Sequence, residues 1–302
     1  MYHYVRQIAS SDFPNLKGLE IEAFRRQLDY LTGRFTVISG RDLILSLRSD
    51  SKDLPDNPCL LTFDDGYRDH IEGVVPELID RGITGCFFPP ARPIIERCLL
   101  DVHAIQFVLA SASDVGVLVE ETIEACRTAG VSKETIDSVR NGLTNESRFD
   151  SGEIVFLKRL LQRDLDDEVR KDIVGKLFER YVGRSVKDFS TDLYMSIEEI
   201  KSLTRLGMYV GSHTYSHEWL NEMTPAAQEV EIRRSVEFLS EIGTDTKEWI
   251  MCYPYGAYNS DTIRILRKYQ CVVGLTAEVG VASWSHSDPL EMKRFDTNDF
   301  PQ

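Results

Sequence analysis

The chain has 302 residues, of which 42% are hydrophobic and 28% charged. This composition predicts a folded protein with a full hydrophobic core and excludes a disordered chain. Thirty-five basic against 49 acidic side chains give a formal charge of −14. Since nucleic acids and anionic membranes both attract basic surfaces, we expect neither as the main partner.

No stretch reaches the roughly 18 apolar residues that a membrane span needs, so we expect no transmembrane segment. The opening residues 1–6 lack the basic and then hydrophobic pattern of a secretory signal, which predicts a cytoplasmic protein. The six cysteines are scattered without a Cys-x-x-Cys pair, and we expect reduced thiols. The sequence leaves the oligomeric state open.

Apolar runs and helical patterns alternate in the first and last thirds of the chain. We expect strands at 59–63, 84–88, 208–211, 249–252 and 272–275. We expect helices at 70–80, 196–206, 224–242 and 260–269, the second of them opened by a capping box from Ser196 to Glu199. This alternation predicts an α/β fold with parallel strands, in an open sheet or a barrel.

The middle of the chain has a different pattern. After Pro93 no proline occurs until Pro225, which permits long helices. Apolar residues at three- and four-residue spacing recur there among charges. We interpret residues 95–190 as a mostly helical insertion in a single domain that spans 1–302.

Two polar clusters follow predicted strands, where parallel α/β folds carry their functional groups. The first is 62–66 (Thr-Phe-Asp-Asp-Gly), in which one of the two adjacent aspartates can bind a cation while the other faces a substrate. The second contains His213 and His217, whose four-residue spacing on one face of a helical turn suits a shared metal ion. Each cluster alone is also compatible with an ordinary turn, but together they favour a metal site.

These segments resemble motifs of the polysaccharide deacetylase superfamily, also called the NodB-homology or carbohydrate esterase family 4 superfamily. Residues 62–66 and 213–217 are similar to its first and second motifs, and 253–256 (Tyr-Pro-Tyr-Gly) to its third. Residues 1–5 resemble the opening strand of one subgroup. The resemblance covers 1–94 and 191–300, and it implies a distorted (β/α) barrel of the NodB-homology type.

The resemblance also implies a metal-dependent hydrolase that removes an N-acetyl or other acyl group from an amino sugar. By position, Asp65, His213 and His217 would hold one divalent ion, with a metal-bound water as nucleophile. Asp64 would be the general base, and the backbone N–H of Tyr255 would stabilise the oxyanion. The ligands favour zinc, with nickel, cobalt, manganese and iron as alternatives.

The sequence departs from the family pattern at two places. Many members carry an arginine three residues before the Tyr255 position, where this chain has Cys252. Our hypothesis is that Arg294, after the last predicted strand, reaches Asp64 instead. Many members also supply a late histidine as general acid. His286 is the late histidine of this chain and a weak candidate, while His3 could line the mouth of the barrel.

Three aromatic residues are candidates for sugar binding: Tyr215 and Trp219 beside the histidines, and Tyr253 in the third motif. Ordinary packing is an equal alternative for them. Without an export signal, we expect a small or carrier-linked amino sugar as substrate. Bacterial surface-polysaccharide or lipopolysaccharide assembly would be the setting.

Two other functions are compatible with these residues. Two histidines and a carboxylate also form the facial triad of iron(II) oxygenases. However, Asp65 precedes His213 by 148 positions, whereas such triads usually place the acid beside a histidine. The second alternative is a non-catalytic carbohydrate-binding relative that keeps the metal site. The presence of Asp64 argues against it, since binding alone does not require an additional carboxylate.

Overall fold

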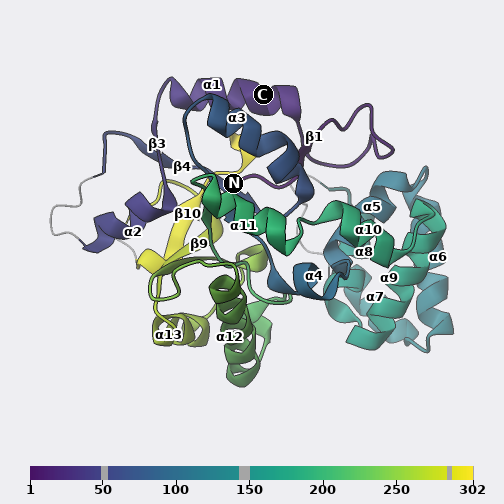
Figure 1. Ribbon diagram of the computed structural model, residues 1–302. Helices are drawn as coiled ribbons and strands as arrows, with labels where there is room; N and C mark the ends of the chain where they lie inside the picture. The colour runs from purple at the N-terminus through teal and green to yellow at the C-terminus, as the bar shows by residue number, and fades with distance from the viewer. Residues whose placement is uncertain (49–53, 143–149, 284–287, 302) are drawn as a thin grey trace. The chain divides into compact units, whose positions relative to one another are not determined.

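The computed structural model describes residues 1–48, 54–142, 150–283 and 288–301. They form two compact units. Unit 1 comprises Met1–Gln7, Gly18–Arg97 and Thr191–Gln302, and unit 2 comprises Ile8–Lys17 and Cys98–Ser190. Figure 1 follows the chain through both units by colour.

Every strand pair in the described part of unit 1 is parallel. The pairs are β1 (Val5–Arg6) with β2 (Leu19–Glu20), and β3 (Thr36–Ile38) with β4 (Pro58–Leu60). Two three-stranded sheets have the orders β5 (Thr62–Asp64), β6 (Cys86–Phe88), β7 (Tyr209–Val210) and β8 (Trp249–Cys252), β9 (Cys271–Val279), β10 (Met292–Arg294).

Two single parallel bridges extend these ladders. Tyr2 pairs with Phe63 of β5, and Ser212, just after β7, pairs with Met251 of β8. The bridges join neighbouring strands, but the described residues contain no closed ring of strands. The α/β class with parallel strands is therefore confirmed, and the closure of a barrel stays a prediction.

Helices follow most strands of unit 1; four of them correspond to the predicted ranges, whereas those at 21–32, 40–48 and 91–96 were not predicted. They are α1 (Ile21–Thr32), α2 (Gly40–Arg48), α3 (Val75–Asp80), α4 (Ala91–Glu96), α11 (Ile197–Arg205), α12 (Pro225–Glu241) and α13 (Ser260–Lys268). The capping box of Ser196 and Glu199 opens α11 as predicted. Only the start of the helix expected at 70–80 differs, because His70–Val74 forms a π-helical turn before α3.

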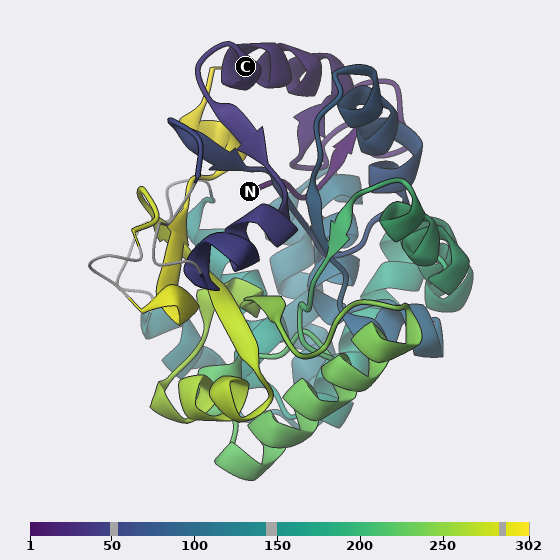
Figure 2. The ribbon, with the colours of Figure 1, turned by 60° about the vertical axis from the view of Figure 1, so that its left-hand side comes forward.

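The core of unit 1 explains where its polar groups gather. All four side chains of β8 are fully buried, and Ile250 packs in one cluster with Phe88 of β6 and Val273 of β9. Helix α13 covers β9, as a second view shows (Figure 2). Because the strand bodies are apolar, the polar side chains collect where the strands end.

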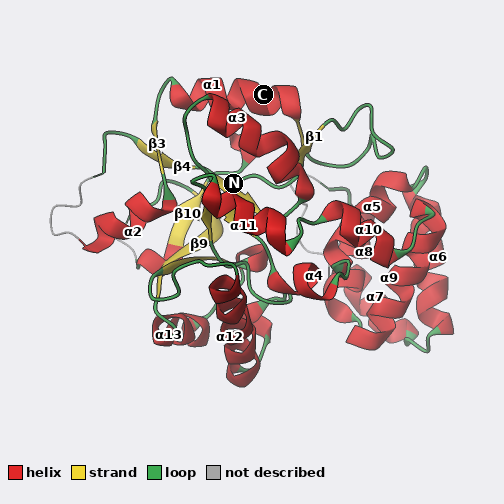
Figure 3. Cartoon of the chain, in the orientation of Figure 1, coloured by secondary structure: helices red, strands yellow, loops and turns green. Residues whose placement is uncertain are grey.

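Unit 2 consists of helices joined by loops in its described part (Figure 3). They are α5 (Asp101–Ser111), α6 (Val115–Thr128), α7 (Lys133–Asn141), α8 (Gly152–Arg159), a π-helical turn (Leu160–Asp164), α9 (Asp167–Val182) and most of α10 (Val186–Leu193). Phe189 packs edge-on against Phe107 and Phe178, at ring distances of 4.6 and 5.1 Å. The predominance of helix agrees with the pattern of 95–190.

None of the helices in the described ranges combines the length and the apolar character that crossing a membrane would require.

Candidate active site

Four strand ends of unit 1 bring buried polar side chains together. Asp64 ends β5, Cys252 ends β8 and Arg294 ends β10, while His213 follows β7. All four side chains are at most 8% exposed. The carboxyl ends of the strands thus form a single polar cluster, at the place where parallel α/β folds carry their chemistry.

Asp65, His213 and His217 converge on one point. Oδ1 of Asp65 lies 3.5 Å from Nε2 of His213 and 3.3 Å from Nε2 of His217. One candidate ligand atom from each residue lies within 4.8 Å of the others. One carboxylate and two imidazole nitrogens in this arrangement fit a divalent ion such as zinc and leave room for further ligands.

The ring of His213 is oriented by the main chain. Its Nδ1 lies 2.8 Å from the carbonyl oxygen of Cys252, which can only accept a hydrogen bond. Nδ1 therefore carries a proton, and Nε2 points toward Asp65. This is the usual outer hydrogen bond of a metal-binding histidine. Asp65 is held similarly, because the hydroxyl of Tyr67 donates to its Oδ2 at 2.8 Å.

The predicted helical turn from His213 to His217 is wrong. The segment is irregular, and Thr214 and His217 have left-handed φ angles of 61° and 62°. Asp65 and Tyr255 are also left-handed, at 73° and 58°. Non-glycine residues pay for this conformation, and such strain concentrates at functional sites. The histidines meet because the loop turns sharply, which their spacing does not reveal.

Side chains of helix α12 hold this loop in place through hydrogen bonds. The carboxylate of Glu231, 6% exposed, accepts hydrogen bonds from both the backbone N–H and the hydroxyl of Ser216. The hydroxyl of Ser212 donates to that of Ser235 at 3.0 Å. These bonds fix residues beside the two histidines, so the loop is preorganised by groups outside the metal triad.

Asp64 is held by Arg294. Nη1 of Arg294 lies 3.0 Å from each oxygen of the carboxylate, which is 2% exposed. Burial alone would raise the pKa of Asp64, but the charge of Arg294 outweighs it and the pKa lies below its usual range. Asp64 is therefore ionised at neutral pH, as a proton acceptor requires.

Two further groups approach Asp64, and sequence reasoning undervalued both. The thiol of Cys252 lies 3.3 Å from Oδ2. Nε2 of His3 lies 4.0 Å from the same oxygen, and the His3 side chain is 41% exposed. The bridge between Tyr2 and Phe63 explains this approach, since it places the first residues beside β5.

The aromatic candidates differ in their surroundings. Tyr215 and Tyr253 are 3% and 1% exposed, with hydroxyls donating to Glu96 and to the carbonyl of Leu290. Rings so deeply buried have almost no surface to offer a sugar, and we drop this interpretation for both. Trp219 is half-buried and stacks on Tyr255 with ring centroids 4.2 Å apart and planes 2° apart.

Among the other histidines, His70 is fully buried with Nε2 2.8 Å from the carbonyl oxygen of His3, which fits a structural role. His286 lies outside the described residues.

The family model for polysaccharide deacetylase matches residues 174–274, which include both histidines and the third motif but neither Asp64 nor Asp65. Over these residues the chain is similar to the polysaccharide deacetylases. A curated relative, YxkH of Bacillus subtilis (strain 168), is named as a candidate polysaccharide deacetylase and is 31% identical over 90 residues. That match spans 30% of this chain and 32% of the relative.

Three solved structures share the fold over nearly the whole chain. Streptococcus pyogenes deacetylase PplD in complex with acetate has a TM-score of 0.60 at 15% identity, over 98% of this chain and 89% of that one. IcaB from Ammonifex degensii has a TM-score of 0.54 at 18% identity, over 97% of this chain and 89% of that one. The deacetylase domain of BpsB from Bordetella bronchiseptica has a TM-score of 0.52 at 14% identity, over 98% of this chain and 94% of that one. The predicted resemblance to the polysaccharide deacetylase superfamily is confirmed.

Proposed function

We propose that this protein is a metal-dependent hydrolase that removes an N-acetyl or other acyl group from an amino sugar. The observation that carries the proposal is the convergence of Asp65, His213 and His217 beside the buried, ionised Asp64. The deacetylase relatives support the reaction class. A divalent ion held by the three ligands would polarise the acyl carbonyl and acidify a water, and zinc suits this ligand set.

The remaining groups have distinct tasks in this reaction. Asp64 accepts a proton from the attacking water, and Arg294 keeps the carboxylate ionised and oriented. The backbone N–H of Tyr255 stabilises the oxyanion as the water oxygen adds to the acyl carbon. The carbon–nitrogen bond then breaks, and the nitrogen takes a proton to leave as the free amine.

His3 is our candidate for the donor of that last proton. Its imidazole lies beside Asp64 and is exposed enough to meet a substrate. Trp219, half-buried and stacked on Tyr255, remains a candidate contact for the sugar ring. We also propose that the protein acts in the cytoplasm in surface-polysaccharide assembly. We propose further that its strands close into a distorted (β/α) barrel and that residues 95–190 are an insertion in one domain.

Metal content and deacetylation measured together test the proposal. We expect about one divalent ion per chain by mass spectrometry, and release of free amine from N-acetylated amino sugars. Asp65→Ala should lose both the ion and the activity. Asp172→Asn, an exposed aspartate of α9 paired with Lys176, is the matched control and should keep both. Absence of metal in the parent protein, even after incubation with zinc, would contradict the proposal.

Asp64→Asn separates an enzyme from a carbohydrate-binding relative. An enzyme should keep its metal and lose most of its rate, because the amide cannot accept the proton. A binding protein should keep its affinity for the sugar, and the parent protein should then release no amine.

A further inference from the structure

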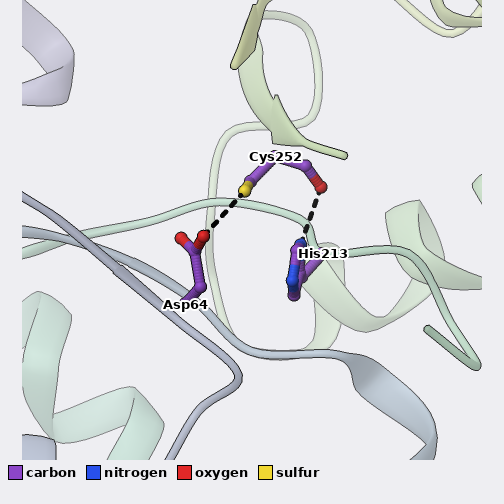
Figure 4. A group of neighbouring side chains, drawn as sticks. All are labelled: Asp64, His213 and Cys252. Carbon is purple, nitrogen blue, oxygen red and sulfur yellow. Dashed lines mark hydrogen bonds between the residues drawn. The ribbon is translucent and has the colours of Figure 1, made fainter. Parts of the chain in front are cut away.

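Cys252 touches two different parts of the site through two different groups. It is fully buried at the end of β8. Its carbonyl oxygen accepts the hydrogen bond from Nδ1 of His213 at 2.8 Å, and its Sγ lies 3.3 Å from Oδ2 of Asp64 (Figure 4). One residue thereby contacts both a metal ligand and the carboxylate that we assign as the base.

The chemistry of the thiol and the carboxylate decides which of the two donates the hydrogen bond between them. Asp64 is ionised beside Arg294, and a carboxylate has only acceptor atoms. The hydrogen between sulfur and oxygen must therefore belong to the thiol, which is a weak donor.

The two donors hold Asp64 from different strands. Arg294 reaches the carboxylate from the end of β10, at 3.0 Å from either oxygen, and by itself leaves the plane of the carboxylate free to turn. The thiol approaches Oδ2 from the end of β8. A second donor from another direction fixes that plane, and a base must be fixed in this way to meet its proton at hydrogen-bond distance.

We propose that Cys252 is a positioning residue, whose thiol fixes the carboxylate of Asp64 at a set position relative to His213. The inference rests on the proposed function only in taking Asp64 as the base. In this arrangement Arg294 supplies the charge that neutralises Asp64, and Cys252 supplies the contact that orients its carboxylate. The main-chain carbonyl of Cys252 orients the metal ligand whatever the side chain is.

The kinetic test compares Cys252→Ala with Cys252→Ser. Loss of the donor should lower kcat about tenfold while KM stays unchanged, because misplacing a reacting group slows chemistry without weakening binding. The serine hydroxyl also donates, so it should restore most of the rate. The absorption spectrum of the cobalt-substituted protein should be the same in all three proteins, since the carbonyl that orients His213 remains.

Cys271→Ser is the matched control. Cys271 is also a buried cysteine, on neighbouring β9, and its thiol contacts the main-chain carbonyls of Trp249 and Val273 instead of Asp64. This variant should keep the parent kcat. A Cys252→Ala protein with unchanged kcat, or a Cys252→Ser protein no better than alanine, would overturn the proposal.

An infrared measurement tests the contact without any activity. The S–H stretch of Cys252 is the band that disappears in Cys252→Ser, and hydrogen bonding to a carboxylate lowers its frequency. In Asp64→Asn it should move toward the unbonded frequency, while the band lost in Cys271→Ser should not move. If the parent protein hydrolyses no acylated sugar, the proposed function fails, and the infrared result still decides on the thiol. An S–H frequency of Cys252 that is the same in the parent protein and in Asp64→Asn would disprove the contact between the thiol and Asp64.

Discussion

Nη1 of Arg294 lies 3.0 Å from both carboxylate oxygens of Asp64, although 230 positions separate the two residues in the chain. Both side chains are almost fully buried, at 7% and 2% exposure. A buried charge needs a partner, so each of these residues makes the other tolerable inside the protein.

Arg294→Met should affect both stability and pH dependence. It leaves a buried carboxylate unpaired, which costs about 3–5 kcal/mol. Arg294 lowers the pKa of Asp64, so its removal raises that pKa, and activity should fail at a higher pH on acidification. In the parent protein, the stabilisation that ionised Asp64 gains from Arg294 is complete above the pKa of about 3.9 that an aspartate has in the unfolded chain. It is lost as the pH falls toward the lower pKa of Asp64 in the folded protein.

Denaturant unfolding and pH–rate profiles measure these effects. Arg264→Met is the matched control, because Arg264 forms an exposed pair with Asp261 and such pairs contribute about 0–1 kcal/mol. An Arg294→Met profile that coincides with the parent profile would contradict the pairing.

His3→Gln should lower kcat on an acetamido sugar by about 10²-fold or more, since it removes the proposed proton donor. An acetyl ester of 4-nitrophenol serves as an internal comparison, because its leaving group departs as an anion and needs no proton. We expect the ester rate to change little. Equal losses on both substrates would instead indicate that His3 acts on Asp64 or on folding.

Trp219→Ala separates packing from sugar binding. Trp219 stacks on Tyr255, whose backbone is left-handed and supplies the proposed oxyanion contact. If the stack holds that backbone, the variant should lose about 1 kcal/mol of stability and some kcat, with KM unchanged. Kinetics with a sugar series measure this, and a rise in KM alone would show that Trp219 contacts the substrate directly.

Glu231→Gln should weaken metal binding about 10- to 100-fold, because Glu231 accepts both hydrogen bonds from Ser216 between the two histidines. Competition with a zinc chelator measures the affinity. Glu237→Gln, on the exposed face of the same helix α12, should leave it unchanged. Equal affinities for the parent and the Glu231 variant would mean that the loop keeps its shape unaided.

Gly211→Ala should destabilise the protein by about 1–3 kcal/mol through overpacking. An added Cβ would lie 2.5 Å from Cε1 of Phe88 and 2.6 Å from the carbonyl oxygen of Ile250. Gly175→Ala, in α9 with nothing within 4 Å, is the control and should stabilise by up to about 1 kcal/mol. Thermal unfolding of both variants gives the comparison, and a Gly211 variant as stable as the parent would contradict the close approach.

Five strand regions and four helices of unit 1 could be predicted because their signals are local, whereas short strands such as 5–6 and 19–20 and the helices at 21–32 and 40–48 were not predicted. Apolar runs such as 249–252 and the capping box at Ser196 need no information from elsewhere in the chain. The end of β5 and the end of β7 could be paired because polar motifs mark both. Whether the strands close into a ring depends on pairings between short segments, which no local pattern encodes.

The finer structure of the site was harder to predict. Tyr215 follows the left-handed Thr214, so its direction depends on a turn that the spacing of the histidines does not reveal. Cys252 was set aside because a thiol cannot replace the charge of an arginine. In the structure the charge arrives from Arg294, and the thiol has only to donate a hydrogen bond.

The bond from His213 to the backbone of residue 252 has a consequence for how this site can change in evolution. A carbonyl oxygen is present whichever amino acid occupies the position, so the metal ligand keeps its orientation through any substitution that preserves the strand. A change of the side chain at 252 therefore alters only the contact with Asp64 and leaves the orientation of His213 intact. If the proposed function holds, the source of the charge that neutralises Asp64 can change in this fold without a loss of the metal-binding geometry.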